Sequence, residues 1–498
     1  MSESHAPRYV HGLLIAWLAA FPALPASGQS PIPTLDDETI ERIDAFVARE
    51  VIDSGLPGVA IAVLRDGHAP YVRGFGHDGK GRAITGDTPF PIGSLTKSFT
   101  ALLIRQEIEA GRLDADAPVQ HYLPWFRLAD AEASSRITLR HLLNQTSGLA
   151  RADGITPLVR RSEAGATDLA RSLDTVKLNR PVGERFEYSN LNYVLLGAIL
   201  QNETGRRWDA LVRERVLTPL AMTRSYTDHD SARRDGMTQL HRVWFGIPVA
   251  HTTRLPPGFA PAGSLVASAN DLAHYLQLLL ANGETPGGRI LSAQGVRQLL
   301  APGSSTATTT LLSSDFRFRY GEGWFVGPFG AAPDARWHLG NLASFVAWMV
   351  LLPVERQAVV VLINANSELP LGHVNAVMSR LPLGIVNLLQ SQLPPSGPSL
   401  RSAYRVFNLG SALAMLLSLA VAWWASRRRR KWAAPTLVTA VAGLVGVLYA
   451  TGMTPTLLAA FAPDLALVLA IVSVLLCLPL ALRIGGWVRR TSARTATP

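Results

Sequence analysis

The hydrophobic pattern begins with a short apolar leader. Arg8 precedes an apolar stretch from about Leu13 to Leu24, and the small residues Ala26-Ser27-Gly28 follow it. A basic start, an apolar centre too short to span a bilayer comfortably and a small-residue cleavage site are typical of a secretory signal peptide. We therefore expect a signal peptide over residues 1–28, with an uncleaved N-terminal anchor as the alternative.

Residues 34–382 have strand patterns at both ends and helical patterns between them. The runs Gly58–Leu64 and Pro70–Phe75 flank an Asp-Gly pair, which predicts a hairpin. Phe345–Leu352 and Ala358–Ile363 have the β-branched and aromatic content of a late strand pair. The predicted helices include Ser98–Glu109, Leu139–Leu143 and Leu191–Leu200. This order predicts an α/β (α+β) domain, in which an antiparallel sheet built from both ends is flanked by helices and carries an inserted all-α lobe.

A Pro-rich linker over residues 383–404 leads into a predicted membrane domain, residues 405–498. This domain contains three apolar runs, at about 406–425, 433–452 and 463–482. Each run has roughly the 20 residues that a helix needs to cross a bilayer, so we expect three transmembrane helices. The alternative is three buried helices of a soluble protein. The basic block Arg427–Lys431, which lies between the first two runs, argues against it.

The net charge of +10 lies entirely in this C-terminal part. Residues 401–498 contain eleven Lys or Arg and one acid, Asp464, so they carry 11 − 1 = +10, and residues 1–400 are neutral overall. Basic residues confined to the flanks of apolar runs indicate membrane topology and not nucleic-acid binding. The positive-inside rule places the basic block in the cytoplasm and residues 34–404 outside, as a signal peptide also requires. We therefore expect a multi-pass inner-membrane protein with a periplasmic domain.

The cysteine and histidine content narrows the chemistry further. The single cysteine, Cys477, lies in an apolar run, so neither an intrachain disulfide nor a cysteine metal cluster is possible. The histidines are scattered, without a His-x-x-x-His or His-Glu-x-x-His pattern. The Gly-x-Gly pairs at Gly74 and Gly321 lack the third glycine of a dinucleotide site. We therefore expect neither a metal nor a cofactor.

The first candidate site is Ser94-Leu95-Thr96-Lys97, which opens an apolar helix. Residues three apart share a helix face, so Lys97 can reach the Ser94 hydroxyl. A serine becomes a nucleophile when a base takes its proton, and a lysine is such a base when burial or positive neighbours lower its pKa. The helix start also offers backbone N–H groups that stabilise negative charge. A helix-capping serine beside a solvated lysine is the alternative.

The second candidate is Tyr188-Ser189-Asn190, which precedes the apolar helix Leu191–Leu200 and so lies on a loop that can project into a cleft. Beside a cationic lysine, Tyr188 would have a lowered pKa and would transfer protons. Asn190 would donate a hydrogen bond to a substrate carbonyl. A half-buried tyrosine next to a capping asparagine is the alternative.

The third candidate is His338-Leu339-Gly340, just before the late strand pair and at a predicted strand edge. Gly340 would let a substrate approach the backbone closely, because it has no side chain. The N–H of Asn341 would complete an oxyanion hole with the N–H of Ser94. A purely structural His338 is the alternative.

In this order, the three motifs resemble those of the serine β-lactamase and penicillin-binding-protein superfamily. The chain looks closest to the class C β-lactamase-related branch, with its esterases and D-amino-acid peptidases. The resemblance extends to Pro91–Lys97, Gly111–Asp114, Ile137–Leu149, Phe186–Asn190, Pro261–Leu265 and Tyr320–Trp324. It implies acylation of Ser94, proton transfer by Lys97 and Tyr188, and an oxyanion hole of backbone N–H groups. It also implies substrate binding by Asn190, His338, Gly340 and Asn341.

One departure concerns the third motif. The β-lactamase branch usually has Lys-Thr-Gly where this chain has His338-Leu339-Gly340. A lysine anchors a substrate carboxylate permanently, whereas a histidine near its unperturbed pKa is mostly neutral at pH 7 and gains charge on acidification. We expect a membrane-tethered serine hydrolase, esterase-like or D-alanyl-D-alanine carboxypeptidase-like, acting on small-molecule, peptide, ester or β-lactam-like substrates. The alternative is a non-catalytic penicillin-binding-like ligand sensor coupled to the membrane helices.

Overall fold

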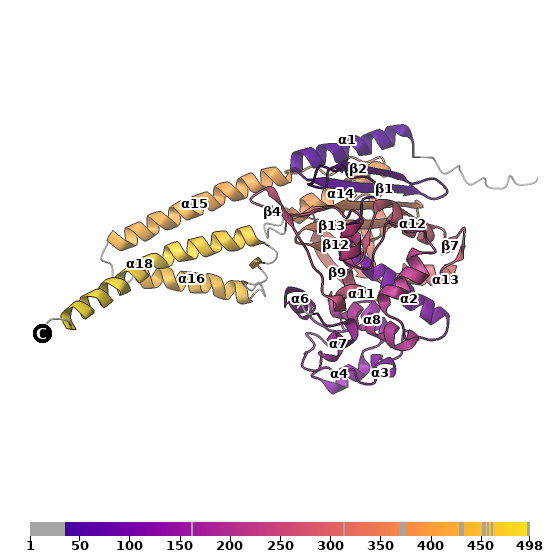
Figure 1. The fold of residues 1–498 in the computed structure, drawn as a ribbon, viewed down its shortest axis with the longest axis horizontal. Helices are drawn as coiled ribbons and strands as arrows, with labels where there is room; N and C mark the ends of the chain where they lie inside the picture. The colour runs from indigo at the N-terminus through magenta and orange to yellow at the C-terminus, as the bar shows by residue number, and fades with distance from the viewer. Residues whose placement is uncertain are drawn as a thin grey trace, which may run out of the picture.

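The computed structural model describes residues 35–160, 163–311, 314–367, 374–427, 433–450, 455, 458–459 and 462–495. Residues 35–389 form a globular domain of sheet and helices, and helices of the C-terminal part project from it to one side (Figure 1). The predicted signal peptide at residues 1–28 and most of the basic block lie outside the described residues.

Among the described residues, eight antiparallel strands form the central sheet, in the order β2-β1-β14-β13-β12-β11-β10-β9. Strand β1 (Gly58–Arg65) pairs with both β2 (Tyr71–Gly76) and β14 (Gln357–Ile363), so strands from the two ends of the domain lie side by side in the sheet. The remaining strands are β13 (Phe345–Leu352), β12 (Ala332–Leu342), β11 (Phe325–Phe329), β10 (Ser314–Tyr320) and β9 (Thr306–Leu311). The predicted antiparallel sheet built from both termini is therefore confirmed.

Helices cover both faces of this sheet. Every residue of β13 and β14 is buried, as expected for strands with packing on both sides. Helices α1 (Asp37–Ser54) and α14 (Val374–Leu389) cover one face, and α12 (Ala269–Leu280) packs on β1 and β14 from the other (Figure 1). The sheet thus provides a rigid wall for the site described below.

The inserted lobe lies between β2 and β9 and is mainly helical. Its helices are α2 (Thr96–Glu109), α3 (Val119–Tyr122), α4 (Ala131–Arg136), α5 (Leu139–Leu143), α6 (Arg151–Arg160), α7 (Ala166–Arg171), α8 (Asn190–Thr204), α9 (Trp208–Val212), α10 (His229–Arg234), α11 (Ala260–Gly263) and α13 (Ala293–Leu299), besides α12. Short strand pairs lie between these helices: β3 (Phe90–Pro91) with β6 (Val266–Ala267), β4 (Leu240–Trp244) with β5 (Ile247–His251), and β7 (Glu284–Thr285) with β8 (Gly288–Arg289). Strand β15 (Ala365–Asn366) pairs in parallel with β4.

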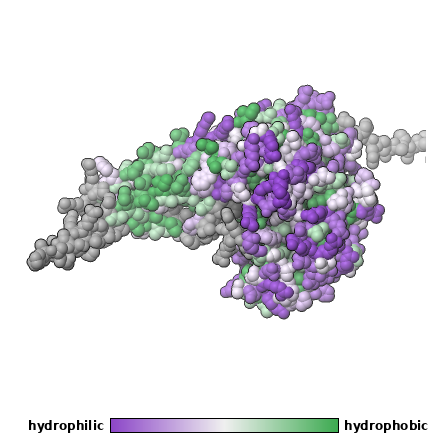
Figure 2. Space-filling view, viewed as in Figure 1, coloured by the Kyte–Doolittle hydropathy of each residue, from purple (hydrophilic) through white to green (hydrophobic). Residues whose placement is uncertain are grey.

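The C-terminal helices α15 (Leu400–Arg427), α16 (Ala433–Ala450) and α18 (Pro463–Thr495) fall where the three apolar runs were predicted. Within the described residues, one helical stretch, Leu400–Ala425, is long and apolar enough to cross a membrane, and Pro463–Pro479 is a shorter apolar helix. The prediction of three transmembrane helices is therefore not confirmed. Hydrophobic residues nevertheless cover much of the visible surface of the projecting helices, unlike that of the globular domain (Figure 2).

The predicted linker at residues 383–404 is much shorter in the structure. Residues 383–389 continue α14, with Leu383, Ile385 and Val386 buried, and residues 400–404 begin α15. The helix continues through Pro382 because its apolar face packs against α1 and β14. Even the intervening segment is held, since Arg380 donates hydrogen bonds to the carbonyls of Gly397 and Pro398 at 2.7 and 2.8 Å.

Candidate active site

The turn before α2 positions Ser94. The 3-10 turn Gly93–Leu95 leads directly into α2, so Ser94 and Lys97 lie one helical turn apart. The strand pair β3–β6 and the hydrogen bond from Ile92 N–H to the Leu265 carbonyl, 2.9 Å, hold this turn in place. Ser94 is half-buried and Lys97 fully buried, which leaves the hydroxyl reachable while it screens the amine from water.

Three oxygen atoms surround the Lys97 amine. Its Nζ lies 2.9 Å from Ser94 Oγ, 2.9 Å from Asn190 Oδ1 and 2.7 Å from the Ala262 carbonyl oxygen. Two of these partners can only accept, whereas the serine hydroxyl can also donate. The amine donates hydrogen bonds to all three oxygen atoms. Once neutral, it can donate to Asn190 and Ala262 and accept the Ser94 O–H through its lone pair.

The electrostatic surroundings favour that neutral amine. Burial is the main cause that holds the pKa of Lys97 well below its usual range, and the positive charge of Arg151 lowers it further. Arg151 begins α6, beside the tyrosine loop, and its side chain is exposed. No carboxylate contacts the amine among the hydrogen bonds and ion pairs of the described residues. Lys97 therefore fits the role of general base.

Tyr188 lies beside the same pair. The Lys97 Nζ is 5.0 Å from the centroid of its ring. Burial raises the pKa of Tyr188 far above its ordinary value, and the nearby Ser94 side chain only partly opposes this. The predicted lowering of the Tyr188 pKa was wrong, because burial disfavours the charged phenolate. Tyr188 is a neutral phenol that can donate and accept protons without being ionised.

Gln145 holds the tyrosine loop, and the sequence reasoning did not assign it a role. Its Oε1 accepts hydrogen bonds from the Ser189 N–H at 2.9 Å and from Asn192 Nδ2 at 2.5 Å. Its backbone is in the left-handed region, with φ of 58°, an uncommon conformation that is found mainly where surrounding contacts enforce it. Gln145 falls in the motif 137–149, where a polar run between an apolar helix and Gly148 was the available signal.

The side-chain amide of Asn190 contacts both Lys97 and α6. Its Oδ1 accepts from the lysine, and its Nδ2 donates to the Gly154 carbonyl of α6 over 3.4 Å. Gly154 lies so close that a Cβ there would be 2.8 Å from Asn190 N. The predicted donation from Asn190 to a substrate carbonyl stays a prediction, while its acceptor role toward Lys97 is a feature that sequence reasoning missed.

His338 is buried next to the tyrosine cluster. Its Nδ1 donates to the Leu339 carbonyl at 2.7 Å, so the neutral ring presents Nε2 as an acceptor to the Tyr320 hydroxyl at 3.0 Å. Burial, with a smaller contribution from Lys97, lowers the pKa of His338 to about 3. Desolvation therefore opposes a positive charge on His338 even under mild acidification. Tyr320 had not been assigned a role.

Gly340 brings β12 against the serine turn. A Cβ at Gly340 would lie 1.9 Å from the Ile92 carbonyl oxygen and 2.9 Å from Ser94 N. On the facing side, a Cβ at Gly93 would lie 3.2 Å from Asn341 N. The glycine thus permits the close approach of the chain's own backbone, while the predicted approach of a substrate stays a prediction. The same contact brings the backbone nitrogens of Ser94 and Asn341 together, as a two-donor oxyanion hole requires.

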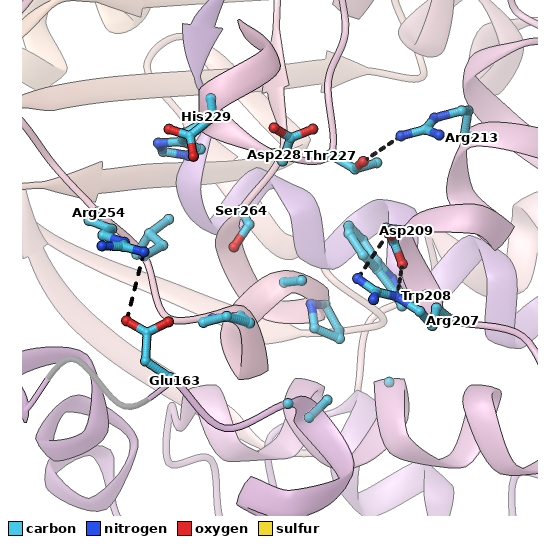
Figure 3. A pocket seen from close by; sticks show the side chains of 18 of the residues that line it. Glu163, Arg207, Trp208, Asp209, Arg213, Thr227, Asp228, His229, Arg254 and Ser264 are labelled. Atoms are coloured by element: carbon cyan, nitrogen blue, oxygen red, sulfur yellow. Dashed lines mark hydrogen bonds and ion pairs between the residues drawn. The ribbon is translucent and has the colours of Figure 1, made fainter. Parts of the chain in front are cut away.

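A separate hollow of about 600 Å³ lies at α11, the helix that carries Ala262 (Figure 3). None of Ser94, Lys97, Tyr188 or His338 lines it. Its charged residues are largely paired with one another, as in Arg207 with Asp209 and Arg254 with Glu163 (Figure 3). We therefore take the turn around Ser94, and not this hollow, as the candidate active site. Among the described residues, no three His, Cys, Asp or Glu side chains are grouped so that they could hold a metal ion.

The central sheet with its helical lobe, and the serine, lysine and tyrosine that meet at the start of α2, define the serine β-lactamase and penicillin-binding-protein superfamily. Residues 41–378 match the family described as Beta-lactamase, and the chain belongs to this family.

Two curated relatives illustrate the breadth of this family. Penicillin-binding protein 4 of Amycolatopsis lactamdurans is 33% identical over 261 residues, which cover 51% of this chain and 66% of that protein. Protein flp of Staphylococcus aureus (strain MRSA252) is 26% identical over 336 residues, covering 67% and 64%. The chain therefore spans just under two thirds of the length of these relatives.

Two solved structures share the fold. The penicillin-binding protein homologue from Pyrococcus abyssi has a TM-score of 0.59 at 24% identity, covering 71% of this chain and 78% of that one. D-amino acid amidase from Ochrobactrum anthropi SV3 has a TM-score of 0.60 at 22% identity, covering 71% and 99%. At this level of identity the likeness establishes the fold alone.

Proposed function

We propose that this protein is a serine hydrolase that works through an acyl-enzyme on Ser94. The observation that carries the proposal is the buried amine of Lys97, which lies within hydrogen-bonding distance of the serine hydroxyl and has no carboxylate partner there. A buried amine of lowered pKa is an effective base near neutral pH.

In the proposed mechanism, Ser94 Oγ attacks the substrate carbonyl while its proton passes to Lys97. The backbone N–H groups of Ser94 and Asn341 stabilise the oxyanion that forms. Tyr188 passes its proton to the leaving group as the bond to the carbonyl carbon breaks, and the proton held by Lys97 replaces it. A water molecule then attacks the acyl-enzyme and gives a proton to the neutral Lys97–Tyr188 pair. As the acid leaves, this proton returns to Ser94 Oγ, and the enzyme is restored.

The proposed substrates are esters, D-amino-acid amides or peptides, and β-lactam-like compounds. The relatives' names support this range, since they include a penicillin-binding protein and a D-amino acid amidase. The neutral His338 favours substrates whose binding does not depend on a carboxylate at that position. Efficient β-lactam hydrolysis is therefore the least favoured of the three.

We further propose that the domain is tethered outside the cytoplasmic membrane through α15. The stretch Leu400–Ala425 has the length and composition of a membrane span, and its exposed side chains include Leu409, Leu413 and Leu416. The charge distribution and the predicted leader support the same orientation. The spans at 433–452 and 463–482 remain part of the proposal.

The deciding experiment labels the full-length protein in detergent with a fluorophosphonate probe. We expect labelling of the wild type, none of Ser94→Ala, and wild-type labelling of Ser135→Ala, an exposed serine on α4. Lys97→Arg should slow acylation by about 10²–10⁴-fold, because a guanidinium cannot take the proton. The exposed Lys177→Arg is its matched control. Equal labelling of wild type and Ser94→Ala would refute the proposal.

A second candidate is a ligand sensor without turnover. It is favoured by direct contacts between the domain and the C-terminal helices, such as the hydrogen bond of 2.6 Å between Ser367 Oγ and Tyr404 Oη. For a sensor, a penicillin-type probe should bind stoichiometrically with no hydrolysis of any ester or D-amino-acid amide. Binding should then be unaffected by Lys97→Ala.

A further inference from the structure

The β4–β5 hairpin has an apolar surface that the site does not use. Ile247 and Val249 are 66% and 45% exposed, and they lie on one face of β5 because alternate strand residues share a face. The half-buried Trp244 lies directly opposite Ile247 on β4 and so shares that face. We call Trp244, Ile247 and Val249 the hairpin patch.

The turn of this hairpin has an unusual residue choice. Trp244 pairs with Ile247, which leaves Phe245 and Gly246 as a two-residue turn with φ of 48° and 87°. Such turns favour Asn-Gly or Asp-Gly, because both central residues have positive φ. An aromatic residue at the first position is strained, and strain of this kind persists where surrounding contacts enforce it.

The contacts that hold the turn come from the C-terminal helices. The Phe245 ring lies 6.0 Å from that of Phe407, and Asn408 Nδ2 donates to the Phe245 carbonyl at 3.0 Å. Gly246 is so close to Tyr404 that a Cβ there would be 3.0 Å from the Tyr404 Cβ. The hairpin is therefore docked on the second and third turns of α15, where that helix leaves the globular domain (Figure 1).

The part of α15 that contacts the hairpin, residues 404–408, lies where the predicted membrane span begins. A span needs about 20 residues, so one that ends at Ala425 enters the hydrocarbon near residue 406. Arg401 and Arg405 are exposed just before that point, suited to lipid headgroups, and Val406, Leu409 and Leu413 are exposed just after it. The hairpin patch lies beside this transition, and aromatic and aliphatic side chains are enriched at such interfaces.

We infer that the β4–β5 hairpin inserts its patch into the headgroup–acyl boundary of the bilayer that α15 crosses. This inference rests on the membrane tether proposed above. It gives the domain, which is already docked on α15, a second contact with the bilayer, and this contact restricts the tilt of the domain relative to the membrane. The orientation extends to the site, because β4 pairs with β15, whose Asn366 donates to the Leu342 carbonyl at the end of β12 at 2.7 Å.

The test places a fluorophore on the hairpin in the full-length protein. With Cys477→Ser as background, Ile247→Cys and the control Glu132→Cys, exposed on α4 in the distant helical lobe, are labelled and reconstituted in lipid nanodiscs. Nitroxide lipids should quench the label at position 247 and not at position 132. Aqueous iodide should quench the label at position 247 with a constant several-fold smaller than at position 132.

The outcomes separate the two proposals. A protein that fails to enter nanodiscs overturns both the tether and the hairpin inference. If it enters but the labels at positions 247 and 132 behave alike, the tether stands and the hairpin inference falls. Protection of position 247 from iodide without nitroxide quenching means that protein, such as a second copy of the chain, covers the patch, and this too overturns the inference.

Discussion

At the residue scale, charge in this site is governed by burial. Lys97, Tyr188 and His338 are each shifted toward their neutral form, with desolvation the largest cause in every case. Such shifts suit the proposed acyl-transfer mechanism, in which a proton is taken from serine and returned to a leaving group.

The low pKa of His338 makes a prediction about substrate charge. Between about pH 5 and pH 8 a free imidazole changes charge, but a group whose pKa is about 3 stays neutral across that range. We therefore expect the ratio of KM values for an anionic ester and its neutral analogue to be flat with pH. A ratio that falls on acidification would show that a protonated His338 binds the anion.

The charge of Arg151 predicts a shift in the pH profile. Arg151 lowers the pKa of Lys97, so its removal in Arg151→Ala raises that pKa. Because the free amine is the active form, the acidic limb of kcat/KM should then move to higher pH. Arg151→Lys, which keeps the charge, should leave the limb close to its wild-type position. An unchanged limb in Arg151→Ala would mean that this charge does not reach the amine.

At the element scale, the site depends on how closely β12 approaches the turn before α2. This approach is a backbone contact, permitted by glycine on both sides, at Gly93 and Gly340. In the proposed oxyanion hole the N–H groups of Ser94 and Asn341 act on one oxygen atom, so a displacement of β12 away from the turn would weaken it.

Gly340→Ala tests this contact. The added methyl would lie 1.9 Å from the Ile92 carbonyl, so β12 must move away. We expect kcat to fall by about 10²–10³-fold, as for loss of one oxyanion donor, and the protein to lose about 1–3 kcal/mol of stability. Gly287→Ala is the control, since its Cβ would meet only Thr285 Oγ1 at 3.7 Å. Wild-type kcat in Gly340→Ala would remove β12 from the proposed oxyanion hole.

At the scale of the whole molecule, the C-terminal part is docked on the domain and not merely linked to it. Leu400, Tyr404 and Phe407 are buried in the main core, with exposed fractions of 2%, 1% and 7%. The Arg401 side chain donates to the Ile52 carbonyl at 3.1 Å, so the end of α1 is also held by α15. Removal of the tether should therefore destabilise the domain itself.

Two truncations, compared in the same detergent, measure this coupling. Ending the chain after residue 399 exposes the surface that Leu400, Tyr404 and Phe407 cover, and each such side chain contributes about 1.5–3 kcal/mol when buried. Ending it after residue 427 keeps α15, so its thermal midpoint should lie closer to that of the full chain. Tyr404→Phe, which removes only the hydroxyl, should lower the midpoint by about 2 °C. Equal midpoints for the two truncations would mean that α15 is a passive tether.

Features that depend on residues close together in the chain were predicted correctly, whereas features that depend on distant residues were missed. The hairpin around Asp66, the late strand pair and the i, i+3 relation of Ser94 to Lys97 were predictable, because periodicity and turn residues are local. The linker was predicted to start at residue 383, but α14 continues to Leu389, because its apolar face is stabilised by α1, far away in the chain. Gln145 and Tyr320 were overlooked, because only their partners, Ser189 and His338, give them a role.

The sequence by itself determined the family, the order of the elements and the candidate catalytic residues, because each of these depends on local motifs and their spacing. Tertiary structure decided the directions of the pKa shifts and the hydrogen-bond partners. Lys97 meets Asn190 and Ala262 across 93 and 165 positions, and desolvation depends on everything packed around a group. A motif can specify a histidine or a tyrosine, but the burial that keeps it neutral is a property of the assembled fold.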